Sequence, residues 1–309
     1  MDRLQEYIDR VKEMSPDVIV KEAKIEDGHD FVKLFNKHYK RKTNIDYYNW
    51  QFFKSSLLSK LFMAYEGHEL IGIYGIKISS ITSSAKIGFA VDFLIDEAHR
   101  KKGIAFLLEG AVQKFCLDND VSIIAALPNI YGNSAFRSMG WKSLAKIDTL
   151  LLKNSDFVKF DSTVNISCTE KETALISFVK DKKYCFWRYD QHPFYKYESI
   201  IINKDVFAVI KKFEDSLTGV IVGDIVDIKY TIEEFDNLFE KVMDKMIKMK
   251  INAVSTWALP HTKLYQLLLE KGFESVAQER FFCVKYFGDN PIYFNIENWN
   301  IVQIDAEIY

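Results

Sequence analysis

The chain has 309 residues, of which 48% are hydrophobic and 27% are charged, and its formal net charge is −2. This composition excludes a disordered or collagen-like chain, and the length is sufficient for two domains. Because proteins that bind a phosphate backbone usually carry a basic excess, the near-zero charge argues against nucleic acid as a partner.

The four cysteines are widely spaced, and none belongs to a C-x-x-C pair. This spacing argues against a metal site and against a disulfide framework, so we expect reduced thiols in a cytoplasmic protein. Residues 1–14 predict an amphipathic helix and not a signal peptide, because Leu4, Ile8 and Val11 share one helical face. No apolar run approaches the roughly 20 residues of a membrane span. Homo-oligomerisation is left open.

The hydrophobic pattern of the first half predicts a mixture of helices and strands. Residues 87–95 form a nearly continuous apolar run, so we expect a central strand that is covered on both faces. The other predicted strands are 18–20, 61–65, 70–78, 121–127 and 141–152, and the predicted helices are 30–39, 46–53, 103–117 and 131–139.

The second half predicts a similar order of elements. Residues 154–156 form the joint, and the absence of a Pro/Gly/Ser-rich linker there predicts that the halves pack closely. The aromatic tail 288–309 is expected to be docked. The predicted helices are 173–180, 184–189, 232–249 and 263–271, and the predicted strands are 197–202, 206–213, 219–228, 253–257 and 275–287.

Short motifs recur between the halves. At an offset of 132 residues, Ala126-Leu127-Pro128 recurs as Ala258-Leu259-Pro260, Gly140-Trp141 as Gly272-Phe273, and Asp92 as Asp224. At an offset of 137, Tyr47-x-x-Trp50 recurs as Tyr184-x-x-Trp187. Three features at one offset and in one order are hard to explain by chance. The sequence therefore predicts a duplication, with domains 1–153 and 154–309 sharing one fold.

The loop between the strand at 87–95 and the next helix has the pattern R-x-x-G-x-(G/A). Backbone N–H groups at a helix N-terminus, with the helix dipole behind them, form an anion site, and small residues let a ligand approach closely. A pyrophosphate is the natural occupant, although neither a P-loop nor the dinucleotide fingerprint is present. The loop residues are Arg100, Lys101, Lys102, Gly103, Ile104 and Ala105.

Together with Asn129-x-x-Gly132-x-x-Ala135-Phe136-x-x-x-Gly140-Trp141, this loop resembles the GNAT (Gcn5-related N-acetyltransferase) superfamily over about residues 18–152. The resemblance implies an α/β fold with a mixed (α+β) sheet, whose fourth and fifth strands splay apart around acetyl-CoA. It puts the pyrophosphate on the loop 100–105. It also puts the pantetheine arm along Phe93, Leu94 and Ile95, with Asn129 and Phe136 beside the thioester.

Acetyl transfer requires a neutral amine, so a base or a water relay is useful. Asp92 occupies a position that is often acidic in the superfamily, and its side chain leaves the strand on the face opposite Phe93. We expect it to act as the base or to orient the amine, with a structural carboxylate as the alternative. Many members carry Tyr where this chain has Phe136, which cannot donate a proton. Tyr131, Ser134 or water would supply that proton, unless the CoA thiolate needs no acid.

Several other residues have simpler interpretations. His99 is expected to be an exposed loop residue, and the clusters around Trp50 and Trp187 are expected to be core packing more than an acceptor cleft. The basic runs 37–42 and 180–183 are expected to be solvated faces, with binding of an anionic acceptor as the alternative.

The second copy is degenerate at the loop. The offset of 132 places Gly103 on Phe235, and Glu233 and Glu234 add carboxylates where a pyrophosphate would sit. Because these carboxylates repel phosphate, we expect the second domain not to bind CoA. It would cover the first domain and supply part of the acceptor site.

The sequence therefore predicts an N-acetyltransferase that uses acetyl-CoA and no metal. The acceptor would be the primary amine of a small molecule, with an amino sugar or nucleotide sugar suggested by analogy with bacterial enzymes. One alternative is a Fem-like aminoacyl transferase, which resembles this chain in its aromatic helices and its duplication. The other is a non-catalytic acyl-CoA-binding sensor.

Overall fold

The computed structural model describes residues 2–40, 42–153, 157, 175–214 and 219–306. The chain divides into two compact units, which do not follow a single cut in the sequence. Unit 1 consists of Met1–Ala145, Phe178–Phe194 and Phe281–Ile296, and unit 2 consists of Lys146–Ser177, Tyr195–Arg280 and Glu297–Tyr309. In the described part of the chain, no helix has the length and apolar character needed to cross a bilayer.

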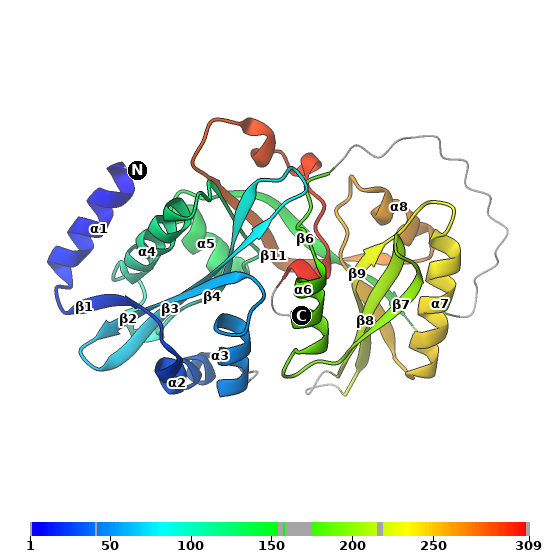
Figure 1. Cartoon of the computed structure of the whole chain (residues 1–309), viewed down its shortest axis with the longest axis horizontal. Coiled ribbons are helices and arrows are strands. Elements are labelled where there is room, and N and C mark those ends of the chain that lie inside the picture. Colours follow the sequence, from blue (N-terminus) through cyan, green and yellow to red (C-terminus); the bar gives the residue numbers. More distant parts are fainter. Residues whose placement is uncertain (1, 41, 154–156, 158–174, 215–218, 307–309) are drawn as a thin grey trace. The chain divides into compact units, whose positions relative to one another are not determined.

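Unit 1 is built on a twisted mixed sheet with the order β1-β2-β3-β4-β5-β11 (Figure 1). Strands β4 and β5 run parallel, and the other neighbours in this order run antiparallel. The strands are β1 (Val18–Glu22), β2 (Leu58–Glu66), β3 (Glu69–Ser80), β4 (Lys86–Ile95), β5 (Ile123–Ala126) and β11 (Glu274–Tyr286).

Helices cover both faces of this sheet. Helices α4 and α5 bury their apolar residues on one face, and α2 and α3 lie against the other (Figure 1). The N-terminal helix α1 packs on α4 through Ile8, Val11 and Leu107. The helices are α1 (Asp2–Met14), α2 (Gly28–His38), α3 (Ile45–Phe52), α4 (Ile104–Asp118), α5 (Ile130–Ser138) and α6 (Lys182–Cys185), with a following π-turn η4 (Phe186–Asp190).

Side-chain caps fix where three of these helices begin. Asn44 accepts a hydrogen bond from the backbone N–H of Tyr47 at 3.0 Å, and Asp181 does the same for Tyr184 at 2.7 Å. Asn129 caps α5 through Gly132 at 2.9 Å. Such caps satisfy N–H groups that have no partner within the helix.

Unit 2 has the strand order β6-β10-β9-β8-β7. Strands β9 and β10 run parallel, as β4 and β5 do in unit 1. Residues 297–306 are docked here, and Trp299, Ile301 and Ile304 are fully buried. The elements are β6 (Lys142–Lys153), β7 (Tyr197–Asn203), β8 (Val206–Glu214), β9 (Ile221–Lys229), β10 (Ala253–Thr256), α7 (Phe235–Lys248) and α8 (Lys263–Glu270).

Strands β11 and β6 each pair with the sheet of the unit that the other half of the chain begins. β11, near the end of the chain, pairs with β5 of unit 1 from Cys283↔Ala126 to Tyr286↔Ile123. β6, at the end of the first half, pairs with β10 of unit 2 from Leu150↔Thr256 to Lys153↔Ala253. The first half of the sequence therefore supplies β6 to the sheet of unit 2, and the second half supplies β11 to the sheet of unit 1.

Most predicted elements are present within a few residues of their expected bounds. The helix predicted at 173–180 is wrong for residues 175–180, whereas residues 173–174 lie outside the described residues. Ile176 and Phe178 instead form isolated bridges with Trp299 and Ile81. The alternating apolar residues Ile176 and Phe178 suit an extended segment with one buried side, which propensity alone does not distinguish from a short helix.

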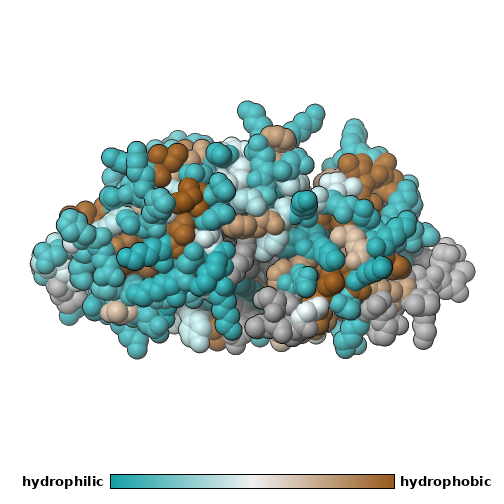
Figure 2. All heavy atoms as spheres, turned by 90° about the horizontal axis from the view of Figure 1, so that it is seen from below, coloured by the Kyte–Doolittle hydropathy of each residue, from teal (hydrophilic) through white to brown (hydrophobic). Residues whose placement is uncertain are grey.

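Hydrophobic side chains are scattered over one face of the molecule. Figure 2 shows a face on which hydrophilic residues predominate and hydrophobic residues form scattered patches. Scattered apolar side chains are normal on a protein surface.

Candidate active site

The central strand β4 contains a β-bulge at Asp92. Gly75 pairs with Val91 and Ile73 with Leu94, so Asp92 and Phe93 lie opposite the single residue Tyr74. Asp92 has a φ of 46°, in the left-handed region that non-glycine residues seldom adopt. Strained bulges of this kind concentrate at functional sites.

The bulge directs two side chains to opposite faces of the sheet, as strand alternation predicts. The hydroxyl of Tyr47, on α3, lies 3.4 and 3.5 Å from the two carboxylate oxygens of Asp92. Phe93 lies on the other face, with its ring 4.8 Å from that of Tyr74 and 5.3 Å from that of Phe136. The contact from Tyr47 is long for a hydrogen bond, as catalytic contacts often are before the substrate binds.

Strands β4 and β5 separate immediately before the bulge. Their parallel pairing runs from Ile87↔Ile123 to Ala90↔Ala126, where β5 ends, whereas β4 continues to Ile95. The edge of β4 from Val91 to Ile95 is therefore no longer paired with β5. Backbone groups on this edge can bind an extended ligand, as a sheet edge does in strand addition.

Residues 100–105, which we call the anion loop, lie between the end of β4 and the first turn of α4. Lys101 and Gly103 have φ values of 64° and 82°, and Gly103 is the N-cap of α4. A Cβ atom at Gly103 would overlap Val11 of α1, so the position suits only glycine for steric as well as conformational reasons. The first turn of α4 contains no acidic residue, and the three basic side chains beside it are exposed. These residues fit a pyrophosphate.

A buried carboxylate, Asp96, holds this loop against α2. Its Oδ2 accepts from Lys37 Nζ at 2.5 Å and contacts His38 Nε2 at 3.0 Å. Its Oδ1 accepts from the backbone N–H of Ala98 at 3.0 Å and contacts His99 Nδ1 at 3.3 Å. Burial alone would raise the pKa of Asp96, but the hydrogen bonds from Lys37 and His38 outweigh it and hold the pKa well below its ordinary value.

The sequence prediction for His99 is wrong. His99 is not an exposed loop residue: its side chain is only 12% exposed, and its Nε2 contacts Glu66 at 3.2 Å. Lys37 and Lys42 of the basic run are exposed, as expected, but Lys37 also binds Asp96, and Lys42 donates to the carbonyl groups of Asn36 and Tyr39. Sequence spacing could not show the contact of Lys37 with Asp96 or that of His99 with Glu66, since these partners come from different elements.

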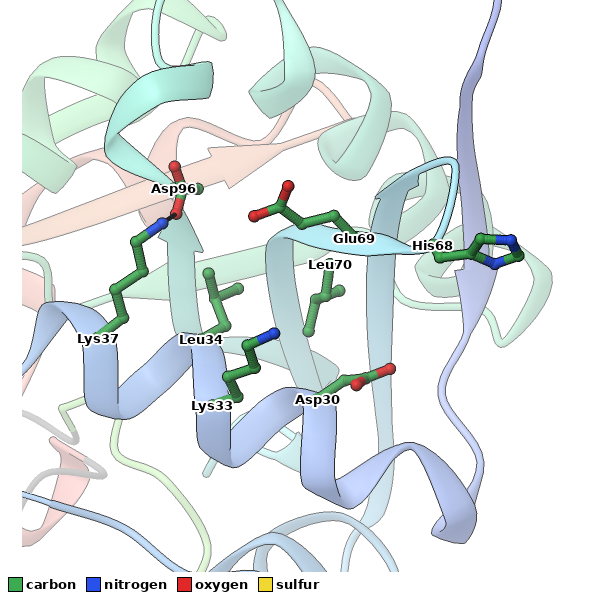
Figure 3. A pocket seen from close by; sticks show the side chains of 8 residues that line it. All are labelled: Asp30, Lys33, Leu34, Lys37, His68, Glu69, Leu70 and Asp96. Atoms are coloured by element: carbon green, nitrogen blue, oxygen red, sulfur yellow. Dashed lines mark hydrogen bonds and ion pairs between the residues drawn. The ribbon is translucent and has the colours of Figure 1, made fainter.

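A cavity of about 390 Å³ adjoins the Asp96 cluster. In Figure 3, the side chains of Lys33 and Glu69 extend into it, whereas His68 points away. Both acidic and basic groups line it, and Leu34 and Leu70 form its apolar part. It does not include Asp92. The lining residues are Asp30, Lys33, Leu34, Lys37, His68, Glu69, Leu70 and Asp96.

Replacing Asp96 is expected to weaken the fold in a pH-dependent way. A lowered carboxyl pKa contributes stability above the unfolded value of roughly 3.9, and that contribution is lost as the pH falls further. Asp96→Asn should therefore lower the free energy of unfolding by about 1–3 kcal/mol at pH 7. Its loss of stability between pH 5 and pH 2 should be shallower than that of the wild type. Urea unfolding across this range measures both quantities, and parallel pH profiles would contradict the assignment.

The remaining predicted site residues lie on or near α5. Asn129 is exposed, and its side chain is engaged in capping the helix. Phe136 is buried, with its ring 4.6 Å from that of Trp141. Tyr131 is 83% exposed and Ser134 is exposed, so both lie on the outer side of the helix, away from Phe136. The predicted roles of these residues remain predictions.

A polar cluster in unit 1 is centred on the buried carboxylate of Glu109. The Oε1 of Glu109 accepts from Gln113 Nε2 at 2.6 Å, Trp141 Nε1 at 2.8 Å and Lys285 Nζ at 3.2 Å. Burial, with a contribution from Glu109, raises the pKa of Cys116 to about 12 and that of Tyr74 well above its ordinary value. The thiol of Cys116 is therefore protonated and unreactive.

The two equivalent tryptophans form one buried pair in unit 1. Their rings stack at 4.6 Å, and each indole N–H donates to the backbone carbonyl of the other residue at 3.0 Å. Lys77 is buried beside them, 4.1 Å from the ring centre of Trp187 and 2.9 Å from Gln51 Oε1. The interpretation of Trp50 and Trp187 as core packing is thus confirmed.

Residues that the offset of 132 matches have different surroundings in the two units. Asp92 lies two residues beyond the last β4–β5 pair, whereas Asp224 lies within the paired region of β9 and β10 and contacts Lys211 at 3.4 Å. Gly103 is the N-cap of α4, whereas Phe235 follows the N-cap of α7, Glu234, and is buried in the core of unit 2.

Tyr47, the partner of Asp92, and Phe194 are two residues of the site that the sequence does not predict. The ring of Phe194 stacks on that of Tyr47 at 5.8 Å with an interplanar angle of 16°. The motif Tyr47-x-x-Trp50 indicates a repeat but not a contact with Asp92. The position of Phe194 could not be inferred, because it depends on the segment Phe178–Phe194 joining unit 1.

Comparisons with known proteins agree with this geometry. Residues 28–141 match the model of the Acetyltransferase (GNAT) family, which lies within the first stretch of unit 1. No curated protein sequence matches the chain significantly. Unit 1 therefore contains a GNAT acetyltransferase domain, and its mixed sheet is the one that the sequence resemblance implied.

Solved structures share the fold at low sequence identity. A GCN5-related N-acetyltransferase from Kribbella flavida has a TM-score of 0.61 and 11% identity, over 87% of this chain and 71% of that one. A protein from Enterococcus faecalis V583, described as a probable N-acyltransferase, has a TM-score of 0.61 and 6% identity, over 87% and 72%. A putative acetyltransferase from Pyrococcus horikoshii has a TM-score of 0.57 and 11% identity, over 92% and 93%.

Proposed function

We propose that unit 1 transfers an acetyl group from acetyl-CoA to the primary amine of a small molecule. The observation that carries this proposal is the separation of β4 from β5 at Ala90 and Ala126, directly before the anion loop. The pyrophosphate would bind the backbone at Gly103 and the side chains of Arg100, Lys101 and Lys102. The pantetheine arm would pair with the edge of β4 at Phe93, Leu94 and Ile95, which brings the thioester toward Asp92.

Asp92 would prepare the acceptor for attack. Its carboxylate takes a proton from the ammonium group or orients the amine directly. The amine nitrogen then attacks the thioester carbonyl, the C–S bond breaks, and the electron pair leaves with the CoA sulfur. The nitrogen carries one extra proton after the attack and releases it to water, which leaves a neutral amide. The charges of Arg100, Lys101 and Lys102 hold the donor during this step.

No side chain is assigned as an acid for the departing sulfur. Phe136 has no proton to donate, and Tyr131 and Ser134 lie on the outer side of α5. A thiolate is stable enough to leave unprotonated, since an ordinary thiol pKa is about 8.5. In this proposal, water therefore protonates the sulfur after it leaves.

Unit 2 is proposed to be a second copy of the fold without a donor site. Its elements follow the order of unit 1, but Glu234 stands at the N-cap of α7 and Asp236 in its first turn. An amino sugar or nucleotide sugar remains the proposed acceptor class. A Fem-like aminoacyl transferase is less well supported, because the basic loop with its left-handed glycine suits a pyrophosphate.

Replacing Asp92 tests the chemical role. We expect Asp92→Asn to lower kcat by about 10²- to 10⁴-fold, because that is the usual contribution of a positioned base. The affinity for acetyl-CoA should remain within about twofold of the wild type, since the anion loop is intact. Thiol release from acetyl-CoA with a panel of amines measures the first quantity, and calorimetry measures the second. Thiol release without dependence on an amine would favour the sensor alternative.

A further inference from the structure

A group of aromatic side chains adjoins Asp92 on the α2–α3 face of the sheet. We call Phe35, Tyr39, Tyr47 and Phe194 the aromatic wall. The ring of Tyr47 stacks on that of Phe194 at 5.8 Å and lies 6.3 Å from that of Phe35, which in turn lies 4.4 Å from that of Tyr39. The wall therefore forms one continuous chain of ring contacts, and its central hydroxyl reaches the Asp92 carboxylate.

The wall is not wholly part of the core. Tyr47 is buried, but Phe194 and Tyr39 are each 37% exposed. Single exposed apolar residues need no explanation. Here, however, two exposed rings continue a buried ring that contacts a carboxylate on a strained bulge. Small-molecule sites are lined mainly by apolar and aromatic side chains with a few placed polar groups, and the wall together with Asp92 has this composition.

The wall is also held in place. The Nδ1 of His192 accepts a hydrogen bond from the backbone N–H of Phe194 at 3.1 Å. The ring of His192 packs 4.4 Å from that of Trp50, which is anchored by the reciprocal pair with Trp187. Phe194 is therefore presented by a rigid support, and a preorganised surface loses little freedom when it binds a ligand.

We propose that the aromatic wall binds the body of the acceptor, and that this body is a ring with a flat apolar face. The ammonium group of the acceptor lies at Asp92, while the ring stacks on Phe194. An amino sugar and an aryl-substituted amine share this chemistry, and an open-chain amine does not. This inference rests on the proposed acetyltransferase function and names the class of its acceptor.

The test compares ring-bearing and open-chain amines on two matched variants. Phe194→Ala removes the exposed ring, whereas Phe186→Ala removes a 55% exposed phenylalanine in the same segment, at the start of η4. Thiol release from acetyl-CoA would be measured with glucosamine, benzylamine and ethanolamine. Since aromatic stacking contributes roughly 0.5–1.5 kcal/mol, Phe194→Ala should raise KM for the two ring amines about 2- to 10-fold.

Three controls define the expected pattern. KM for ethanolamine and KM for acetyl-CoA should not change in Phe194→Ala, and Phe186→Ala should behave as the wild type with every amine. Glucosamine and benzylamine distinguish a sugar from an aryl acceptor, because the true class should show the larger change. Equal effects of Phe194→Ala on ring and open-chain amines would overturn the proposal.

A binding measurement separates this proposal from the proposed function. Saturation-transfer NMR with glucosamine and benzylamine reports contact with the ring protons without requiring turnover. Transfer that is lost in Phe194→Ala and kept in Phe186→Ala supports the wall as a subsite. If acetyl-CoA is turned over but neither variant alters transfer, only the acceptor inference fails. If acetyl-CoA neither binds nor reacts, the proposed function itself fails, and the NMR result still decides whether the wall binds ring amines.

Discussion

Gly103→Glu is expected to abolish acetyl-CoA binding in isothermal titration calorimetry. The φ of 82° at this N-cap disfavours any side chain, and a Cβ atom there would overlap Val11. In addition, the new carboxylate would stand where the helix dipole and the three basic side chains attract a pyrophosphate. We expect a loss of at least about 100-fold in affinity, since a steric and an electrostatic effect combine.

Three companion variants show which effect is responsible. Gly103→Ala introduces the steric strain without the charge, and Lys102→Glu introduces the charge at an exposed position without the strain. Both should weaken binding less than Gly103→Glu. Glu234→Gln alters the corresponding N-cap of α7 and should leave binding unchanged. If Glu234→Gln weakened binding as much as Lys102→Glu does, the model of a single donor site in unit 1 would be wrong.

Glu109→Ala is expected to destabilise unit 1 by about 3–5 kcal/mol, the usual cost of breaking a buried charged contact. Glu109 is fully buried, and its Oε1 is the common acceptor for Gln113, Trp141 and Lys285. Alanine would leave these donors without that acceptor and would also create a cavity. Urea unfolding, followed by tryptophan fluorescence, measures the change.

Glu109→Gln is the matched control for this variant. The amide oxygen can still accept a hydrogen bond from Trp141, but the charge that faces Lys285 is lost. We expect a smaller loss than for alanine, and the difference between the two variants isolates the contribution of the acceptor. Loss of less than about 1 kcal/mol in Glu109→Ala would show that the cluster is not a structural centre of the unit.

Much of the fold of unit 1 could be predicted from the sequence because its signals are local. The apolar run at 87–95 predicts the central strand, and Gly103 with its basic neighbours predicts the anion loop. The helical spacing of hydrophobic residues before and after these two segments predicts the neighbouring helices. These features depend on residues that are neighbours along the chain. They also carry the resemblance to the GNAT superfamily, which the match at residues 28–141 bears out.

The rest could not be predicted because it depends on contacts between distant segments. Nothing near Asp96 indicates that Lys37 and His38, which precede it by 59 and 58 residues, converge on it. The sequence offset does not show either that Phe235 is buried in the core of unit 2 or that Glu234 is the N-cap of α7.

The exchange of β6 and β11 constrains how the protein reaches its native state. The sheet of unit 1 is not complete until β11 pairs with β5, and the paired residues Ala126 and Cys283 are 157 positions apart. During synthesis, the chain must therefore emerge as far as Tyr286 before the domain with the proposed donor site can close its hydrophobic core. Lys285, which pairs with Glu109, emerges at the same stage. Until then, the edge of β5 and the carboxylate of Glu109 lack these partners. Such long-range pairing is slow and is a step at which misassembly occurs.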